Sequence, residues 1–317
     1  MVVGRSVLDM TSPLRTVLVA ALATLALAGC SSDATTGSPS ADSTSATPSA
    51  SVTTQVDARF PTYVALGDSY TAAPLVPDTD TSNGCLRSTN NYPALVAAAL
   101  PGTSLTDVSC SGASSESMIG VQKTNTGLVP AQFDALTEDT DLVTIGIGGN
   151  DANLFATMVG ACSQVTSKDP HGSPCRDKLT AGGTDQLRAA VRQIGGHVTA
   201  IVKGIHDRSP HAKVLVVGYP QILPAHGTCP DLLPLADGDV VYARGVLEDL
   251  VTTIKKATAA AGDAEYVDLF SATAGHDICA KDPWINGAQT DTHAALAFHP
   301  FEAEQQKAAE LVLAALK

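Results

Sequence analysis

Basic residues are scarce in this sequence, and charged residues of either sign are few. Of its 317 residues 16% are charged, and 19 Lys and Arg stand against 32 Asp and Glu, which gives a formal net charge of −13. With no basic stripe to release counterions from phosphates, we expect no nucleic-acid partner. An apolar content of 44% can bury a sizeable core, which excludes a chain that is disordered throughout.

Two common signatures of enzyme sites are also absent. No two cysteines have the C-x2–4-C spacing and no histidine pair accompanies them, so we expect no metal site. The Gly-x-Ser-x-Gly elbow of the α/β-hydrolases does not occur either. Any catalytic site must therefore rest on another motif.

Residues 1–29 predict a secretory signal. Their apolar run, Thr16 to Ala28, is too short to span a bilayer. It ends in Leu27-Ala28-Gly29-Cys30, which resembles the bacterial lipobox, so we expect Cys30 to carry a lipid anchor. The alternative is an ordinary secretory signal with a chance cysteine. Met10 would start a more compact leader than Met1.

Residues 30–58 predict a low-complexity linker. They are mainly Ser, Thr, Ala, Pro and Gly, and they cannot bury enough apolar surface to offset the entropy lost on ordering. A flexible chain of this length has an end-to-end distance of roughly 30 Å. We therefore expect a lipid-anchored tether over 30–58 and one folded domain over 59–317.

The folded part contains six cysteines. They are Cys85, Cys110, Cys162, Cys175, Cys229 and Cys279. An even number outside the cytoplasm indicates disulfides, although six cysteines allow fifteen pairings and their spacing does not choose among them.

Strands and helices alternate along the domain. Short apolar or β-branched runs predict strands at 63–66, 104–108, 141–147, 213–217 and 265–270. Apolar residues at helical spacing predict helices at 91–99, 185–206, 240–261 and 301–317. This order predicts a single-domain, three-layer α/β/α sandwich with a five-stranded parallel sheet, and a site outside the carboxyl ends of the strands.

Candidate catalytic residues follow three of the predicted strands. Ser69 lies in the turn after the first strand, where Gly67 permits unusual backbone angles, although Asp-Ser pairs also form ordinary turns and helix caps. Gly112 follows the second strand and offers a backbone N–H. Asn150 follows the third in a glycine-rich turn, where its amide could donate to an oxyanion or simply form a turn.

A serine nucleophile needs a neighbouring base, and histidine is the side chain that titrates near neutral pH. Eight histidines compete for this role. We favour His299 because it precedes the last predicted helix, where a loop can deliver it over the site, and His293 is its nearest rival. His197 and His206 fall on a predicted helix, and we assign both to structural or surface positions.

The ordered motifs Gly67-Asp68-Ser69, Gly112, Gly149-Asn150-Asp151 and His299-Pro300 resemble the four blocks of the SGNH (GDSL-type) hydrolases. The resemblance spans residues 60–317 and implies a flavodoxin-like sheet. Within that superfamily the chain is most similar to secreted actinobacterial esterases and lipases that carry three disulfides.

This resemblance implies a role for each motif residue. Ser69 would be the nucleophile and His299 the base and then the acid, while the N–H groups of Ser69 and Gly112 and the Asn150 amide would form an oxyanion hole. The implied disulfides are Cys85–Cys110, Cys162–Cys175 and Cys229–Cys279. The reaction needs no metal or organic cofactor.

The chain departs from the family pattern beside the histidine. Most members place an aspartate three residues before it, and here that position is Leu296. We therefore expect a Ser69–His299 dyad with a backbone oxygen from the neighbourhood of Leu296, and Asp291 as the fallback. The usual asparagine after His-Pro is replaced by Phe301.

Together these features predict a monomeric, extracytoplasmic serine esterase or lipase, secreted or membrane-anchored through Cys30, that hydrolyses carboxylic esters or lipids through an acyl-Ser69 intermediate. The alternatives are a glycan deacetylase or acyltransferase of the cell wall, and a lipid- or glycan-binding lipoprotein without turnover. A glycosidase pair of Asp68 and Asp151 is disfavoured because each side chain lies in a turn beside a better candidate.

Overall fold

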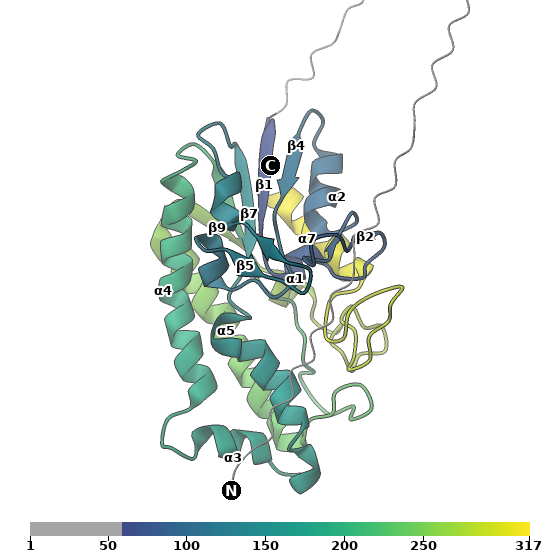
Figure 1. Cartoon of the computed structure of the whole chain (residues 1–317). Coiled ribbons are helices and arrows are strands. Elements are labelled where there is room, and N and C mark those ends of the chain that lie inside the picture. Colours follow the sequence, from purple (N-terminus) through teal and green to yellow (C-terminus); the bar gives the residue numbers. More distant parts are fainter. Residues whose placement is uncertain (1–58) are drawn as a thin grey trace, which may run out of the picture. The chain divides into compact units, whose positions relative to one another are not determined.

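The computed structural model describes residues 59–317 (Figure 1). The predicted signal peptide, the lipid attachment at Cys30 and the linker lie outside the described residues. Five parallel strands form one sheet in the order β4-β1-β7-β8-β9. They are β1 (Thr62–Gly67), β4 (Ser104–Asp107), β7 (Leu142–Gly146), β8 (Lys213–Val217) and β9 (Ala264–Val267). The predicted fold class is confirmed.

The sheet is buried on both faces, as the nearly continuous apolar strands require. Alternate residues point to opposite sides, so that Val64 and Leu66 of β1 pack in one core cluster and Tyr63 and Ala65 in another. The first cluster is completed by α4 (Gln186–His206) and α5 (Asp237–Ala261), and the second by α2 (Tyr92–Ala99) and α7 (Glu302–Ala315). Figure 1 shows these helix pairs on the two sides of the sheet.

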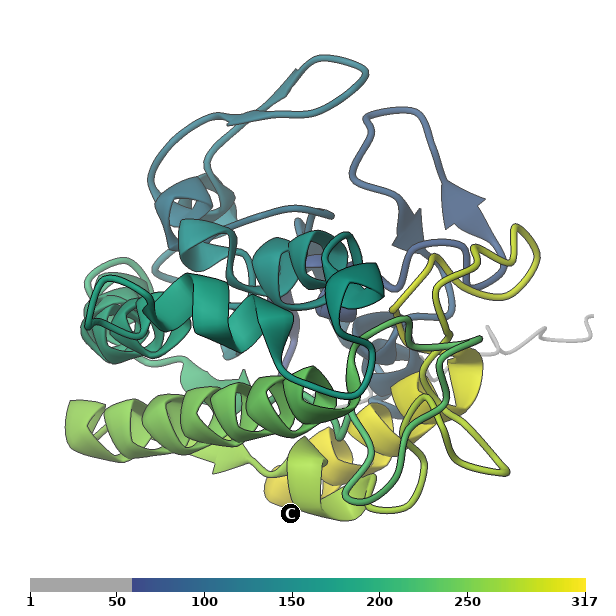
Figure 2. The same cartoon turned by 90° about the horizontal axis from the view of Figure 1, so that it is seen from below.

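Several short elements were not predicted. They are the helices α1 (Ser69–Ala72), α3 (Pro174–Thr180) and α6 (Leu269–Ala272), the hairpin strands β2 (Thr79–Asp80), β3 (Arg87–Ser88), β5 (Gln122–Lys123) and β6 (Leu128–Val129), the 3₁₀ turns η1 (Ser115–Met118), η2 (Gln132–Ala135), η3 (Asp151–Asn153) and η5 (Thr166–Lys168), and the π-helix η4 (Ala156–Ala161). Both hairpins project from the same side of the domain (Figure 2).

The last strand is shorter than predicted. β9 ends at Val267, and the predicted strand residues Leu269 and Phe270 instead belong to α6. The reason is the carboxylate of Asp268, which accepts a hydrogen bond from the N–H of Ser271 at 3.1 Å and so caps the new helix.

Three disulfides join Cys85 to Cys110, Cys162 to Cys175 and Cys229 to Cys279, the pairs that the family resemblance implies. In the chain-entropy model each such loop contributes about 3 to 4 kcal/mol to stability. None of the six cysteines lies in a strand of the sheet, and disulfides persist in oxidising compartments outside the cytoplasm.

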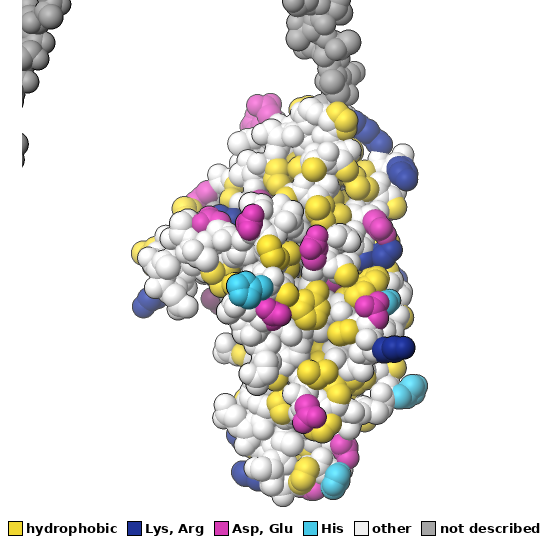
Figure 3. All heavy atoms as spheres, turned by 90° about the vertical axis from the view of Figure 1, so that its right-hand side faces the viewer, with side chains coloured by type: hydrophobic (Ala, Val, Ile, Leu, Met, Phe, Trp, Pro, Cys, Tyr) yellow, Lys and Arg dark blue, Asp and Glu magenta, His cyan; other side chains and the backbone are white. Residues whose placement is uncertain are grey.

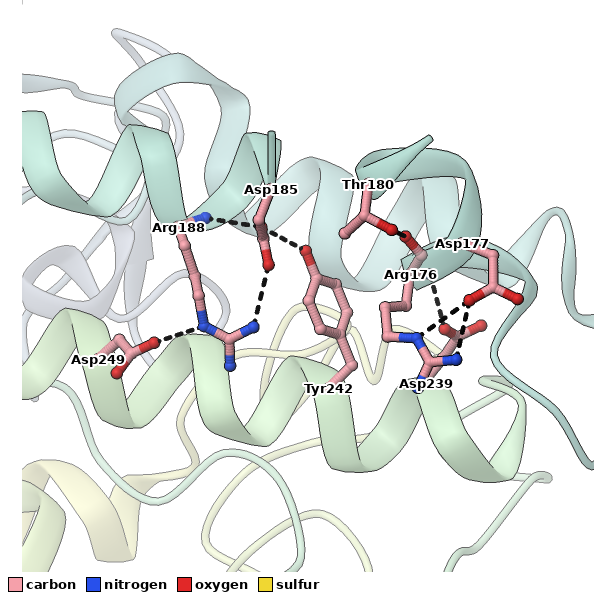
Figure 4. Close-up of polar contacts among 8 residues, drawn as sticks. All are labelled: Arg176, Asp177, Thr180, Asp185, Arg188, Asp239, Tyr242 and Asp249. Atoms are coloured by element: carbon pink, nitrogen blue, oxygen red, sulfur yellow. Dashed lines mark hydrogen bonds and ion pairs between the residues drawn. The ribbon is translucent and has the colours of Figure 1, made fainter. Parts of the chain in front are cut away.

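Polar contacts fasten the segment between β7 and α4 to helix α5. The buried carboxylate of Asp239 accepts from the N–H groups of Cys175 and Arg176 at the start of α3, each at 2.9 Å. Figure 4 draws the contact with Arg176. Asp185, the N-cap of α4, accepts from the Tyr242 hydroxyl at 2.8 Å. These contacts hold in place a segment that also contains the π-helix η4.

Within residues 59–317 no helix combines the length and the apolar composition that crossing a bilayer requires. On the face shown in Figure 3, acidic and basic side chains are scattered among apolar ones, so that face carries no basic patch suited to nucleic acid.

Candidate active site

The four predicted motifs occupy loops at the carboxyl ends of the strands. Ser69 begins α1 directly after β1, Gly112 follows β4, Asn150 follows β7 and His299 lies just before α7. Figure 2 views the domain from the side on which these loops lie. Ser69, Asn150 and His299 line one cavity, so segments up to 230 positions apart in the sequence meet there.

Gly67 allows the turn that presents Ser69. Its φ of +149° is a conformation that side chains rarely adopt, and a Cβ there would lie 2.3 Å from the hydroxyl oxygen of Thr71. Asp68 then caps α1, accepting from the N–H of Tyr70 at 2.9 Å. The serine side chain is consequently held at the first position of a short helix.

Ser69 and His299 are in direct contact. The Nε2 atom of His299 lies 2.8 Å from the Oγ atom of Ser69, and its Nδ1 atom lies 2.7 Å from the carbonyl oxygen of Ala297. A carbonyl only accepts, so Nδ1 carries the proton and Nε2 is left to accept from the serine hydroxyl. The backbone oxygen expected near Leu296 thus comes from the following residue.

Asp291, the alternative partner expected for His299, contacts a different residue. Its Oδ1 atom accepts from the N–H of His293 at 2.9 Å, and within residues 59–317 no carboxylate oxygen lies within 4.0 Å of a ring nitrogen of His299. The imidazole is therefore oriented by a neutral dipole. Burial lowers the pKa of His299 below its ordinary range, and the Ala297 carbonyl acts in the opposite direction.

The histidine loop is fastened to the nucleophile helix through Tyr70. The Tyr70 hydroxyl donates to the carbonyl of Phe298 at 2.8 Å, and its ring stacks on His299 with centroids 5.5 Å apart. Phe298 has a φ of +63°, which is strained for a bulky residue. The Tyr70 hydrogen bond is made to this strained residue, and it fixes the loop that presents the imidazole.

The three expected oxyanion donors retain hydrogens that could be donated to a ligand, and two of them, Ser69 and Asn150, line the cavity with His299. Within residues 59–317 neither the N–H of Ser69 nor that of Gly112 donates to any acceptor. The Asn150 amide donates one hydrogen to the carbonyl of Ala113 at 2.8 Å and retains a second. These groups could stabilise a negatively charged oxygen.

The sequence motifs did not reveal Tyr219, which connects two of these loops. Its buried hydroxyl accepts from the N–H of Gly149 at 2.6 Å and donates to the carboxylate of Asp68 at 2.5 Å. Burial raises the pKa of Asp68 to about 7, while the hydrogen bond from Tyr219 acts to lower it. Its position two residues after β8 is the signal that could have identified it, because Ser69, Gly112 and Asn150 also follow strands.

An apolar cavity of about 330 Å³ opens beside Ser69. Its walls include Phe155, Met158 and Val159 from the region of the π-helix, and Ile222 from the loop after β8. The sequence motifs did not predict this cavity, since its walls come from irregular segments. It has the character of a binding site for an apolar group.

Within residues 59–317 none of the rival histidines lines this cavity. His206 contacts the carbonyl of Asp263, His276 stacks on Trp284, and His197 contacts the carboxylate of Asp151 at 2.7 Å. The last contact involves the neighbour of Asn150, and the position of His197 on a helix does not predict it.

Comparisons with known proteins identify the family of this chain. A model of the GDSL-like lipase/acylhydrolase family matches residues 65–306. Lipase 2 of Streptomyces coelicolor is 40% identical over 68% of this chain and 72% of its own length. A lipase of Streptomyces rimosus is 31% identical over 77% of this chain and 82% of its own length.

Solved structures show the same fold. The phospholipase A1 of Streptomyces albidoflavus superposes with a TM-score of 0.66 at 29% identity, over 80% of this chain and 99% of its own. The extracellular lipase of Streptomyces rimosus superposes with a TM-score of 0.67 at 28% identity and the same coverages.

Removing the Tyr219 hydroxyl should destabilise the protein. In Tyr219→Phe the buried N–H of Gly149 and the carboxylate of Asp68 lose a partner, and we expect the free energy of unfolding to fall by about 1 to 3 kcal/mol in denaturant titrations. Tyr266→Phe is the matched control, because the buried Tyr266 hydroxyl has no partner within residues 59–317. Equal losses in both variants would contradict the assignment.

Proposed function

Because this chain belongs to the GDSL-like lipase/acylhydrolase family, we propose that its activity as a carboxylic ester hydrolase proceeds through an acyl-enzyme on Ser69. The observation that carries this proposal is the 2.8 Å contact between the Ser69 hydroxyl and His299 Nε2, together with the Nδ1 contact to Ala297 that leaves Nε2 free to accept. This arrangement provides a nucleophile and a correctly oriented base.

In the proposed reaction, Ser69 Oγ attacks the ester carbonyl as His299 Nε2 takes the hydroxyl proton. The imidazolium then gives this proton to the leaving alkoxide, and the acyl-enzyme forms. A water molecule releases the acid by the reverse sequence. The N–H groups of Ser69 and Gly112 and the Asn150 amide donate to the developing oxyanion, and each such donor is worth about 10² to 10³ in rate.

The base in this proposal works without a carboxylate behind it. The Ala297 carbonyl fixes the ring and its tautomer, which is the orienting part of the role that an aspartate has in a catalytic triad. A neutral carbonyl stabilises the imidazolium less than a carboxylate would. The partial burial of His299 favours the neutral, proton-accepting form.

Replacement of the nucleophile tests the proposal directly. We expect protein lacking residues 1–57 to hydrolyse p-nitrophenyl butyrate and Ser69→Ala to lose at least about 10³-fold in kcat/KM. Ser111→Ala is the matched control, because the Ser111 hydroxyl is buried without a partner within residues 59–317. Equal rates for the wild type and Ser69→Ala would reject the acyl-enzyme, and an inactive wild type would favour the lipoprotein that only binds lipid or glycan.

The rate should depend on the neutral form of His299. Because its pKa is lowered, kcat/KM should fall to half its plateau only below pH 6.5, the ordinary pKa of histidine, as the ring is protonated. The buried Asp68 carboxyl, with a pKa of about 7, is the competing explanation for an acid limb. Tyr219→Phe separates the two, because loss of the Tyr219 donor raises the pKa of Asp68 and would move an Asp68 limb upward.

The apolar cavity supports a medium or long acyl chain as the group transferred to Ser69. An acetyl group would leave most of its volume of about 330 Å³ empty, which disfavours the glycan deacetylase alternative. One structural relative is a phospholipase A1, so phospholipids are among the natural esters to test.

Filling the cavity should shorten the accepted chain. Gly160 lines it, and no atom lies within 4 Å of the position that a Cβ would take there. Blocking two or three methylene sites at about 0.8 kcal/mol each should lower kcat/KM of Gly160→Leu by about 10- to 50-fold on p-nitrophenyl decanoate and little on the acetate. Gly196→Leu on α4, equally open, is the control, and a uniform loss on both esters would contradict this role.

Two features of the chain, its disulfides and its leader, support a location in the cell envelope. The disulfides support an extracytoplasmic location, and the lipobox-like ending at Cys30 supports a lipid-anchored protein on a tether of residues 31–58. We expect the full-length chain to sediment with membranes and Cys30→Ala to appear in the soluble fraction with the same specific activity. A wild type found wholly in the soluble fraction would favour the ordinary secretory signal.

A further inference from the structure

We propose that His197 is a positioning residue of the oxyanion hole, acting on Gly112 and Asn150 through the carboxylate of Asp151. This inference rests on the proposed function, because it takes those two residues as oxyanion donors. His197 lies on α4, outside the cavity beside Ser69, and its side chain is 49% exposed.

Asp151 is the centre of the arrangement. It directly follows Asn150, and only 6% of its side chain is exposed. Its Oδ1 atom accepts from the N–H of Ser115 at 2.8 Å, and its Oδ2 atom accepts from the Ser115 hydroxyl at 2.7 Å. The third donor is the Nδ1 atom of His197, 2.7 Å from the same Oδ2.

These contacts join the two loops that carry the oxyanion donors. Ser115 lies three residues after Gly112, and Asp151 lies one residue after Asn150. The bonds between Ser115 and Asp151 therefore connect the two loops just beyond the residues that would donate to the oxyanion. A second bond connects the same two loops next to the donors themselves, because the Asn150 amide donates to the carbonyl of Ala113 at 2.8 Å. The distance between the two donors is therefore set by both connections.

The turn after Asn150 needs external support. Ala152 and Asn153 have φ values of +49° and +56°, both in the left-handed region that non-glycine residues rarely adopt. His197 belongs to a helix of 21 residues packed on the sheet, and its bond to Asp151 ties the strained turn to that rigid element. The Nδ1 atom can donate in two forms of the ring: the neutral tautomer that carries its proton on Nδ1, and the imidazolium. The hydrogen bond to Asp151 therefore does not require a charged histidine.

Small displacements of such donors are costly for catalysis. Donors stabilise the transition state only when they are held close to the position of the oxyanion, and they contribute less once they can move. Loss of the His197 bond should thus reduce binding of the transition state and leave binding of the ground-state ester nearly unchanged.

The test compares three variants at this position and on the same helix. His197→Ala removes the donor, His197→Asn keeps an N–H close to the position of Nδ1, and His206→Ala removes a histidine whose Nε2 atom contacts the carbonyl of Asp263, away from the site. For each, kcat and KM are measured on p-nitrophenyl butyrate, with the affinity for butylboronic acid, which forms a tetrahedral adduct on a serine nucleophile.

We expect His197→Ala to lose about 10-fold in kcat and in boronate affinity, with KM within twofold of the wild type. His197→Asn should keep most of both, and His206→Ala should match the wild type. If His197→Ala fails to fold, Ser115→Ala removes a bond to the same Oδ2 atom from the other side and should show the same split between kcat and KM.

Two results would overturn the inference. One is a His197→Ala enzyme that is less thermally stable but retains the kcat and boronate affinity of the wild type. The other is a His197→Asn enzyme as impaired as His197→Ala. A wild type without esterase activity would instead overturn the proposed function, so the two failures are distinguishable.

Discussion

The parallel pairing of β1 with β4 and β7 is the constraint on which the candidate site depends. Parallel strands end at the same edge of the sheet, so the loops that follow three neighbouring strands must lie together. Gly67 pairs in register with Gly146, which brings Ser69 and Asn150 to adjacent turns. His299 comes from the other end of the chain. It lies just before α7, which packs on the face of the sheet opposite α4 and α5.

Buried polar contacts convert this proximity into a defined geometry. Tyr219 joins the Asp68 turn to the Gly149 turn, and Asp151 and Asn150 join the third loop to the second. Each bond satisfies a group that would be costly to leave unpaired in the interior. The same contacts therefore stabilise the fold and hold the proposed donors, so mutations here can affect stability and rate together.

The walls of the cavity have a different origin. They come from irregular segments, chiefly the one between β7 and α4, where the Cys162–Cys175 disulfide and the Asp239 carboxylate hold a short π-helix in place. Irregular backbone tolerates insertion and change better than the strands do. The proposed chemistry thus lies in the turns that follow β1, β4 and β7 and in the loop before α7, whereas the proposed acyl selectivity lies chiefly in the segment between β7 and α4.

The sequence by itself determined the layer architecture, the main strands and helices, and the four motifs in order, because hydrophobic periodicity and turn residues act over a few neighbouring positions. Only the tertiary structure decided what each motif residue contacts. It orients His299 through Ala297 rather than a carboxylate, introduces Tyr219 between two loops, ends β9 at the Asp268 cap and pairs His197 with Asp151. These contacts join residues from 2 to 151 positions apart. A hydrogen bond also requires the two atoms to lie within a few tenths of an ångström of their ideal separation, and no local sequence pattern encodes that distance.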